Sequence, residues 1–198
     1  MNRLQRKISE FIINRSIIDY TPQIFENPAK LPENITTAWR GHEQIIKDLI
    51  TRFNINPQSY LEFGVEFGFS AIAFSNYFKE VTGVDTFEGD IHTMNKQNHF
   101  EQTKNAMSVY PNILLVKADY KDYILKDKNT YDLIHVDIVH TYEDTYKCGL
   151  WAAQHSKVTI FHDTDSFFEV KRAVYAIAKK TKKRFYQYKP HYGLGIIA

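Results

Sequence analysis

The chain has little of what holds small secreted proteins together, because Cys148 is its only cysteine. One cysteine cannot form an internal disulfide, and chains of this kind are typical of reducing compartments. We therefore expect a cytoplasmic protein. With 198 residues, 43% of them hydrophobic, the chain can bury roughly 70% of its unfolded surface as one domain without disulfides.

The sequence also lacks a long uninterrupted apolar run. In the N-terminal stretch MNRLQRKISEFIINRSIID, the apolar positions are separated by Glu10, Arg15 and Asp19. The stretch therefore matches neither a signal peptide nor a membrane span. We expect no membrane partner.

Excess charge of one sign is missing as well, since 25 Lys and Arg against 23 Asp and Glu give a net charge of +2. This balance argues against the basic surface of a nucleic-acid-binding protein. The one basic cluster, AKKTKKR at residues 178–184, is explained by cations at the C-terminal end of a helix. Nucleic acid is not expected as a partner.

Repeats and low-complexity segments are absent, and the N-terminal region shows helical spacing of its apolar residues. Two helices are predicted ahead of the first strand, one from Leu4, Ile8, Phe11 and Ile12 and one from Ile45, Ile46, Leu49 and Ile50. Between them, residues 21–37 contain three prolines and two asparagines together with Ile24, Phe25 and Leu31. This composition predicts an irregular segment that packs on the domain or forms a lid.

From Tyr60 onward, short apolar runs rich in Val and Ile alternate with helix-length segments. The runs are YLEFGV, VTGVD, ILLVKAD, YDLIHVD and VTIFHD. This alternation predicts a parallel sheet covered by helices. The final runs RFYQYK and GLGIIA predict an antiparallel hairpin at the edge. We predict one α/β domain over residues 1–198, with N-terminal helices and a candidate lid in 1–56 and a doubly wound, mostly parallel seven-stranded sheet in 57–198.

Acidic residues lie at or near the ends of the five parallel runs. They are Glu62, Asp85, Asp119, Asp137 and Asp163. Parallel α/β sheets bind ligands at the carboxyl ends of their strands. We therefore expect these carboxylates to converge on a ligand at one edge of the sheet.

The stretch YLEFGVEFGFS joins a predicted strand to a predicted helix through Gly64 and Gly68. Glycine lets the backbone come close to a ligand at the helix N-terminus. The spacing is G-x-x-x-G rather than the G-x-G-x-x-G of dinucleotide sites, so a pyrophosphate cofactor is not indicated. Glu62 would repel a phosphate and favours a cationic ligand or hydroxyl groups.

Two further carboxylates suit a nucleoside. Asp85 follows Glu62 by 23 residues and can accept both ribose hydroxyls, and Asp119 can accept from an adenine amino group. A nucleoside with a positive charge and no phosphate, such as S-adenosylmethionine, satisfies all three. Glu62 and Asp119 could instead cap the helices that follow them, but their joint order and spacing favour the ligand.

The motifs EFGVEFGFS, GVDTFEGD, KADYKDY and HVDIVHTYED occur in this order over residues 60–161. Together they resemble class I S-adenosylmethionine-dependent methyltransferases, many of which carry a glycine where this chain has Glu66. The resemblance implies a Rossmann-like fold and cofactor contacts from the matching positions. These are Glu62, Phe63, Gly64, Gly68, Ser70, Asp85, Thr86, Asp119, Tyr120 and Asp137.

The run DLIHVDIVHTYED followed by VTIFHDTD resembles the branch with macrocin-type sugar O-methyltransferases and cephalosporin-hydroxylase-like proteins. The resemblance implies that Asp137 and Asp163 bind a divalent metal and that His140, with Asp137, is catalytic, His140 as general base. His162, taken as the third ligand, stands where the sugar-modifying members tend to carry Glu. Mg²⁺ prefers oxygen ligands, so His162 favours Mn²⁺, Fe²⁺ or no metal.

Three of these residues have simpler explanations. His140 is suited to remove a hydroxyl proton, or it only hydrogen-bonds its turn. Asp163 could cap a helix that starts near Ser166. His135, inside an apolar strand, is interpreted as a core histidine with satisfied hydrogen bonds.

We therefore expect an enzyme that methylates a hydroxyl of a small molecule, such as a sugar, a phenol or a natural product, with help from a divalent metal. It could form a homo-oligomer. A nucleic-acid or protein methyltransferase and a non-catalytic S-adenosylmethionine-binding module are the alternatives. A base N-methyltransferase would carry N/D-P-P-aromatic where this chain has DIVH, and a binding module would lack the D-x-x-H and HD pairs.

Overall fold

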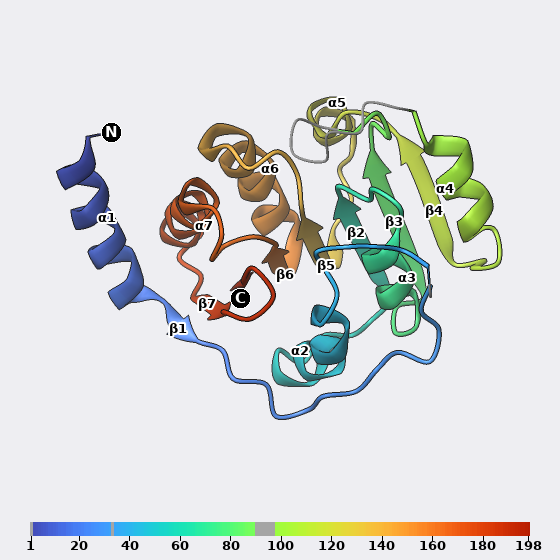
Figure 1. Cartoon of the computed structure of the whole chain (residues 1–198), viewed down its shortest axis with the longest axis horizontal. Coiled ribbons are helices and arrows are strands. Elements are labelled where there is room, and N and C mark those ends of the chain that lie inside the picture. The colour runs from blue at the N-terminus through green and yellow to red at the C-terminus, as the bar shows by residue number, and fades with distance from the viewer. Residues whose placement is uncertain (1, 33, 90–97) are drawn as a thin grey trace.

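The structure is a computed structural model that describes residues 2–32, 34–89 and 98–198. One sheet of eight strands forms its centre, in the order β1-β7-β8-β6-β5-β2-β3-β4 (Figure 1). Its parallel strands are β2 (Ser59–Phe63), β3 (Glu80–Asp85), β4 (Ile113–Lys117), β5 (Tyr131–Val136) and β6 (Ser156–Phe161). The predicted mostly parallel, doubly wound sheet is confirmed.

The direction of winding reverses in the middle of the sheet. The chain runs outward from β2 through β3 to β4, and then returns to place β5 on the other side of β2 and β6 beyond it. The switch point therefore lies between β2 and β5. In sheets of this kind, ligands bind outside the carboxyl ends of the strands at that point.

The C-terminal strands are β7 (Phe185–Tyr188) and β8 (Leu194–Ile197), which pair antiparallel as predicted. An eighth strand, β1 (Ile18–Asp19), pairs in parallel with β7. The prediction of seven strands missed β1, because two residues are too few to show a period-2 pattern. The hairpin consequently lies one strand inside the edge.

Helices cover both faces of the sheet (Figure 1). They are α1 (Arg3–Ser16), the 3₁₀ helix η1 (His42–Ile45), α2 (Ile46–Arg52), α3 (Phe69–Ser75), α4 (Phe100–Met107), α5 (Tyr120–Lys126), α6 (Tyr142–His155) and α7 (Phe168–Thr181). Side chains alternate between faces along a strand. Tyr60 thus packs in the cluster with α2 and α3, and Leu61 packs on α6 and α7, where Cys148 is buried as predicted.

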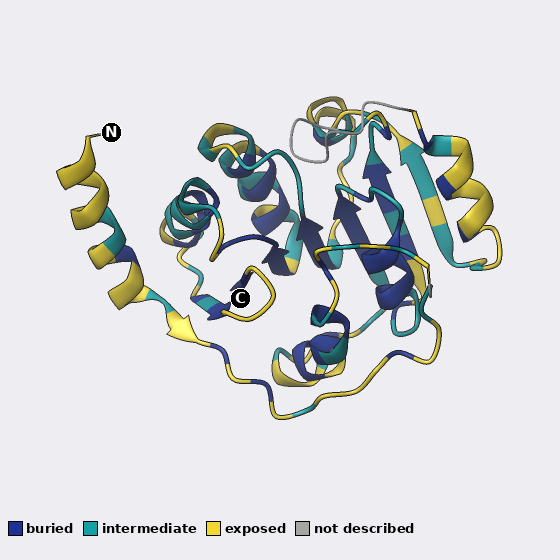
Figure 2. Cartoon of the chain, in the orientation of Figure 1, coloured by how far each residue is buried: buried dark blue, intermediate teal, exposed yellow. Residues whose placement is uncertain are grey.

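The helix α1 stands apart from the body of the molecule (Figure 1), and most of it is exposed (Figure 2). Ile13 is its one buried residue. Within residues 2–32, 34–89 and 98–198, no helix combines the length and the apolar character needed to cross a membrane. At the other end of the chain, Lys179 and Lys180 lie in the last turn of α7, as predicted for the basic cluster.

Candidate functional site

The turn after β2 carries the glycines at the switch point. Gly64 has φ +90°, and a Cβ there would overlap the backbone carbonyl oxygen of Asp137, so only glycine fits. Gly68 has φ +86°, and a Cβ there would lie 2.5 Å from Sδ of Met107. Glu66 between them also has a left-handed backbone, with φ +50°. This conformation explains why a glycine suits that position in related chains.

Asp85 holds this turn in place. Its Oδ2 accepts from the backbone N–H of Val65 at 2.8 Å and of Glu66 at 2.9 Å, and its Oδ1 accepts from that of Phe87 at 2.7 Å. A carboxylate offers about four acceptor positions. Three backbone donors thus occupy most of the acceptor capacity that was predicted to bind ribose hydroxyls, and the carboxylate of Asp85 shapes the turn.

A cavity of about 480 Å³ opens at this edge of the sheet, within the roughly 300–1,000 Å³ of small-molecule sites. Six of the predicted cofactor contacts line it: Gly64, Asp85, Thr86, Asp119, Tyr120 and Asp137. Four others are not among its lining residues: Glu62, Phe63, Gly68 and Ser70. The candidate catalytic and metal-binding residues His140, His162 and Asp163 line it too.

Glu62 is fully buried beneath the cavity rather than facing into it. It accepts a hydrogen bond from the Ser70 hydroxyl, and its Oε1 lies 2.8 Å from Nδ1 of His135. Nε1 of Trp39 donates to Nε2 of His135 at 3.2 Å. Because an indole N–H can only donate, His135 carries its proton on Nδ1. The prediction of His135 as a satisfied core histidine is confirmed.

Phe63 acts through its backbone. Its ring packs against Tyr123 and Trp151 on the face of α5 and α6, whereas its carbonyl accepts from the backbone N–H of Asp137 at 2.8 Å. Val84 accepts from Gly64 in the same way at 3.0 Å. These bonds fix the ends of β2, β3 and β5 relative to one another.

Asp119 caps a helix, as the simpler of its two explanations predicts, and it also lines the cavity. Its Oδ1 accepts from the backbone N–H of Lys121 at 2.7 Å, so it is the N-cap of α5. Next to it, the Tyr120 hydroxyl donates to Oδ1 of Asp144 at 2.7 Å. This end of the cavity is therefore formed by a capped helix start with a fixed aromatic ring.

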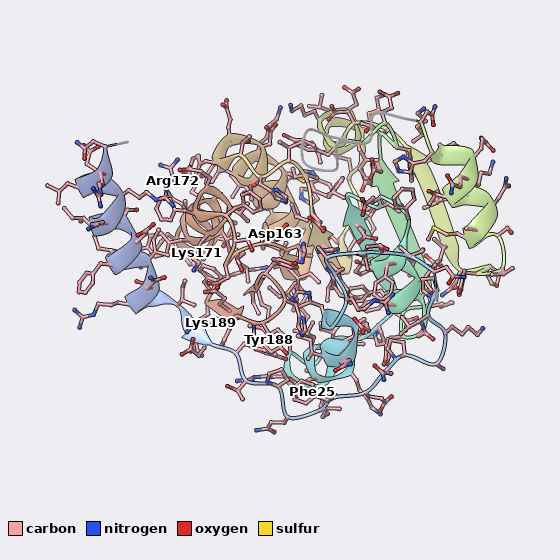
Figure 3. All side chains as sticks on the ribbon, viewed as in Figure 1. Phe25, Asp163, Lys171, Arg172, Tyr188 and Lys189 are labelled. Atoms are coloured by element: carbon pink, nitrogen blue, oxygen red, sulfur yellow. The ribbon has the colours of Figure 1, made fainter. Side chains whose placement is uncertain are left out.

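Two aspartates and two histidines meet where β5 and β6 end; Asp163 is labelled in Figure 3. Nε2 of His140 lies 2.9 Å from Oδ2 of Asp163 and 3.9 Å from Oδ1 of Asp137. Nδ1 of His162 lies 3.2 Å from Oδ2 of Asp137 and 3.3 Å from Oδ2 of Asp163. Each carboxylate is therefore shared between both imidazoles.

Burial and charge oppose each other in this cluster. Burial raises the pKa of Asp137, but the charge of His162 and hydrogen bonds from both histidines outweigh it and hold that pKa far below its usual range. Burial lowers the pKa of His140, yet hydrogen bonds to Asp137 and Asp163 raise it to about 9. Burial likewise lowers the pKa of His162, but the charge of Asp137 and hydrogen bonds to both aspartates raise it to about 10. At neutral pH the carboxylates are ionised and the imidazoles protonated.

The donor set fits a divalent cation. Asp137, His140 and Asp163 present ligand atoms that lie within 4.8 Å of one another. Carboxylate oxygens with an imidazole nitrogen suit first-row transition metals. His162, the predicted third ligand, faces the same carboxylates through Nδ1, and its Nε2 is buried with no hydrogen-bond partner among the described residues. Both histidines thus lie within ion-pair distance of both aspartates, but His140 rather than His162 completes the group of three whose ligand atoms come together.

Asp163 does not cap a helix, since α7 begins at Phe168 without a side-chain cap. Asp163 instead has φ +62°, which turns its carboxylate toward His140. The His140 ring stacks on Phe167 with 4.1 Å between ring centroids.

Part of the lining was missed by sequence reasoning. Residues 36–39 and His99 border the cavity and belong to no motif. Glu66 and Val139 also border it; they lie within the motifs EFGVEFGFS and HVDIVHTYED, but neither was assigned a role. Trp39 was signalled only by its place next to the predicted lid.

The predicted lid, residues 21–37, is attached to the body along its length; residue 33 lies outside the described residues. Asp48 fixes the start by accepting from the Tyr20 hydroxyl at 2.5 Å and from two backbone N–H groups. Asn76 fixes the middle by accepting from the backbone N–H of Lys30 and donating to its carbonyl, both at 2.8 Å. Among the described residues of the segment, Thr36 and Thr37 at its end are the ones that line the cavity.

The strand order, the glycine turn at the switch point and the cavity beside it define the fold of a class I S-adenosylmethionine-dependent methyltransferase. A family model described as a methyltransferase domain matches residues 61–164, which is more than half of the chain. The chain belongs to this methyltransferase-domain family.

Solved structures share this fold. The O-methyltransferase NovP superposes with a TM-score of 0.65 at 16% identity, covering 98% of this chain and 96% of NovP. An O-methyltransferase from Bacillus cereus in complex with SAH superposes with a TM-score of 0.57 at 10% identity, covering 100% of this chain and 92% of the other. Aeropyrum pernix fibrillarin with natively bound S-adenosyl-L-methionine superposes with a TM-score of 0.55 at 13% identity, covering 81% of this chain and 76% of fibrillarin. A search of curated proteins finds no match.

Proposed function

We propose that the protein transfers a methyl group from S-adenosylmethionine to a hydroxyl of a small molecule, a sugar, a phenol or another natural product. The observation that carries this proposal is the cluster of His140, Asp137 and Asp163 in a cavity that Gly64 of the glycine turn also lines. NovP and the Bacillus cereus protein, which share the fold, are O-methyltransferases. The D-x-x-H and HD motifs support the macrocin-type branch.

The residues present fit the methyl donor. Gly64 lines the cavity and carries no side chain, so the backbone can approach the ligand closely. Carboxylates of Glu66, Asp85 and Asp119 also line it, and they favour a ligand with a positive charge and no phosphate. Glu62 and Ser70 would affect the methyl donor indirectly, because the hydrogen bond between them links the strand before the glycine turn to the helix after it.

In the proposed mechanism, the acceptor hydroxyl lies at the His140 end of the cavity. Asp137 and Asp163 would hold a divalent cation, which when bound lowers the pKa of a coordinated hydroxyl. Nε2 of His140 takes the hydroxyl proton, and the oxygen attacks the sulfonium methyl group. The methyl–sulfur bond breaks as the oxygen–methyl bond forms, its electron pair stays on sulfur, and S-adenosylhomocysteine leaves. Residues 36–39 limit the access of water, which favours a reaction in which opposite charges neutralise each other.

The cofactor assignment predicts binding of S-adenosylmethionine and S-adenosylhomocysteine but not of NAD. Isothermal titration calorimetry with each ligand measures this directly. Asp85→Ala should weaken binding of both adenosyl ligands, because it removes the acceptor of three backbone N–H groups in the turn. Asp132→Ala, at the opposite end of the sheet, is the control. Tight NAD binding, or unchanged affinity in Asp85→Ala, would contradict the assignment.

The metal assignment predicts that Asp163→Asn abolishes Mn²⁺ binding, measured by calorimetry without any acceptor. Asp165→Asn is the matched control, because Asp165 is exposed and pairs with Lys171 at 3.0 Å. We expect Mn²⁺ or Fe²⁺ to bind more tightly than Mg²⁺, since imidazole is a poor ligand for Mg²⁺. Equal Mn²⁺ affinity in both variants, or full activity in excess chelator, would remove the metal from the proposal.

The lid assignment predicts slower hydrogen exchange at residues 34–39 when S-adenosylhomocysteine and Mn²⁺ are present. Residues 20–30 should change little, because Asp48 and Asn76 already hold them. Exchange measured by mass spectrometry on peptides from the two parts separates local ordering from a general effect of ligand. Equal protection of residues 34–39 with and without ligand would rule out a lid.

A further inference from the structure

The helix α1 exposes an apolar face. Leu4, Ile8, Phe11 and Ile12 are 68%, 52%, 62% and 49% exposed. Their spacing of four, three and one residues places them on one side of a helix. Contiguous apolar surface of this kind marks an interaction site on a folded protein.

The opposite side of α1 attaches the helix to the body. Ile13 is 1% exposed, and the guanidinium of Arg6 lies over the ring of Phe168 in α7 at 4.9 Å. The exposed apolar face is therefore turned away from the molecule; Figure 2 shows that most of α1 is exposed. No described part of the chain covers it.

Basic residues accompany this face. Within α1, Arg6 faces the body and pairs with Glu10 at 3.0 Å, which leaves Arg3, Lys7 and Arg15 as the basic residues that this pair does not neutralise. The guanidinium of Arg15 lies over the Phe11 ring at 5.3 Å, so a charge sits beside the apolar side chains. An amphipathic helix with basic residues and low overall hydrophobicity is typical of segments that lie in a membrane interface.

We propose that α1 docks on an anionic lipid surface, with its four apolar side chains in the interface and Arg3, Lys7 and Arg15 against the headgroups. The proposal revises the expectation of no membrane partner, which rested on the lack of a long uninterrupted apolar run. The charges decide between this occupant and a second copy of the chain. Pairing α1 with another α1 would bring like charges together, which is unfavourable, whereas anionic headgroups attract each Lys and Arg near the surface. The proposal goes beyond methyl transfer and does not depend on it, because α1 contributes no residue to the cavity lining.

Sedimentation of the full chain with lipid vesicles tests the proposal. Affinity for phosphatidylcholine vesicles that contain phosphatidylserine should exceed that for pure phosphatidylcholine by roughly 100-fold, the factor that about three net positive charges give near such a surface. Added salt should weaken the binding, because it screens exposed charges. Absence of binding, or equal binding to both vesicles, would overturn the proposal.

Matched variants locate the contact. Phe11→Glu and Lys7→Glu should each abolish most of the binding, the first through the apolar face and the second through charge. Leu125→Glu, at a position 69% exposed on α5, and Lys126→Glu, in the same helix, should bind as the wild type does. If the two α5 variants lost as much vesicle binding as the two α1 variants, a role of α1 would be contradicted. Light scattering that shows a dimer in the wild type and a monomer in Phe11→Glu would assign the face to a second copy instead.

Discussion

Replacement of His140 by alanine is expected to lower the rate of methyl transfer roughly 10²–10⁴-fold, the usual effect of losing a general base. Nε2 of His140 lines the cavity and lies 2.9 Å from Asp163, next to the carboxylates proposed to position the acceptor. No other assigned residue removes the hydroxyl proton in the proposed mechanism. Single-turnover measurements with a sugar and a phenol acceptor give the rate of the chemical step.

Three readouts separate a base from a ligand or a structural residue. If His140 is the general base, His140→Asn and His140→Ala should bind Mn²⁺ about as tightly as the wild type does. Their rate of methyl transfer should no longer rise with pH. If His140 is a metal ligand, as its place within 4.8 Å of Asp137 and Asp163 allows, Mn²⁺ affinity falls together with the rate. His155→Ala is the control, since His155 stacks on Trp151 in α6. An unchanged rate in His140→Ala would contradict both roles.

The protonation of His140 makes this experiment informative. Burial lowers its pKa, but hydrogen bonds to Asp137 and Asp163 raise it to about 9. In this arrangement the imidazole carries a proton at neutral pH and cannot accept another. His140 becomes a base only when the two aspartates take a different partner. Binding of a cation by these carboxylates would thus be accompanied by proton release.

The central part of the fold follows from the sequence because parallel strands have a strong pattern. Runs such as YDLIHVD are buried on both faces and read as continuous apolar stretches. The two-residue strand β1 has no such pattern, and its position depends on pairing with β7. The exposure of Leu4 and Ile8 in α1 could not be predicted either, since helical spacing shows an apolar face without showing what covers it.

The site was predicted best where strands end. Asp137, His140 and Asp163 meet because they follow neighbouring parallel strands, which sequence order alone indicates. Glu62 lies inside β2, and alternation places its side chain on the same face as Tyr60, under α3. A strict count of strand positions would have shown this.

Trp39 could not be predicted in the same way. It reaches His135 from an irregular segment, across 96 residues of sequence. No local pattern in the sequence encodes a contact of that kind.

Replacement of Gly64 by alanine is expected to destabilise the protein by about 2–5 kcal/mol, the sum of backbone strain at positive φ and of overpacking. Gly64 has φ +90°, and its new Cβ would overlap the carbonyl oxygen of Asp137. A backbone atom cannot swing aside as a side chain does, so β2 and β5 must separate at the switch point. Urea denaturation measures the loss of stability, and calorimetry with S-adenosylhomocysteine measures the accompanying loss of affinity.

Gly83→Ala is the matched control, because Gly83 lies in the neighbouring strand β3 and a Cβ there would meet a side-chain atom, Val65 Cγ2, at 2.8 Å. Side-chain atoms can shift by a few tenths of an ångström, so the cost should be smaller than at Gly64. Equal destabilisation by both variants would mean that general crowding, rather than the turn, limits the position. Wild-type stability and affinity in Gly64→Ala would show that the cavity does not need the close approach of Gly64 to Asp137, and the glycine turn would lose its proposed role in holding the methyl donor.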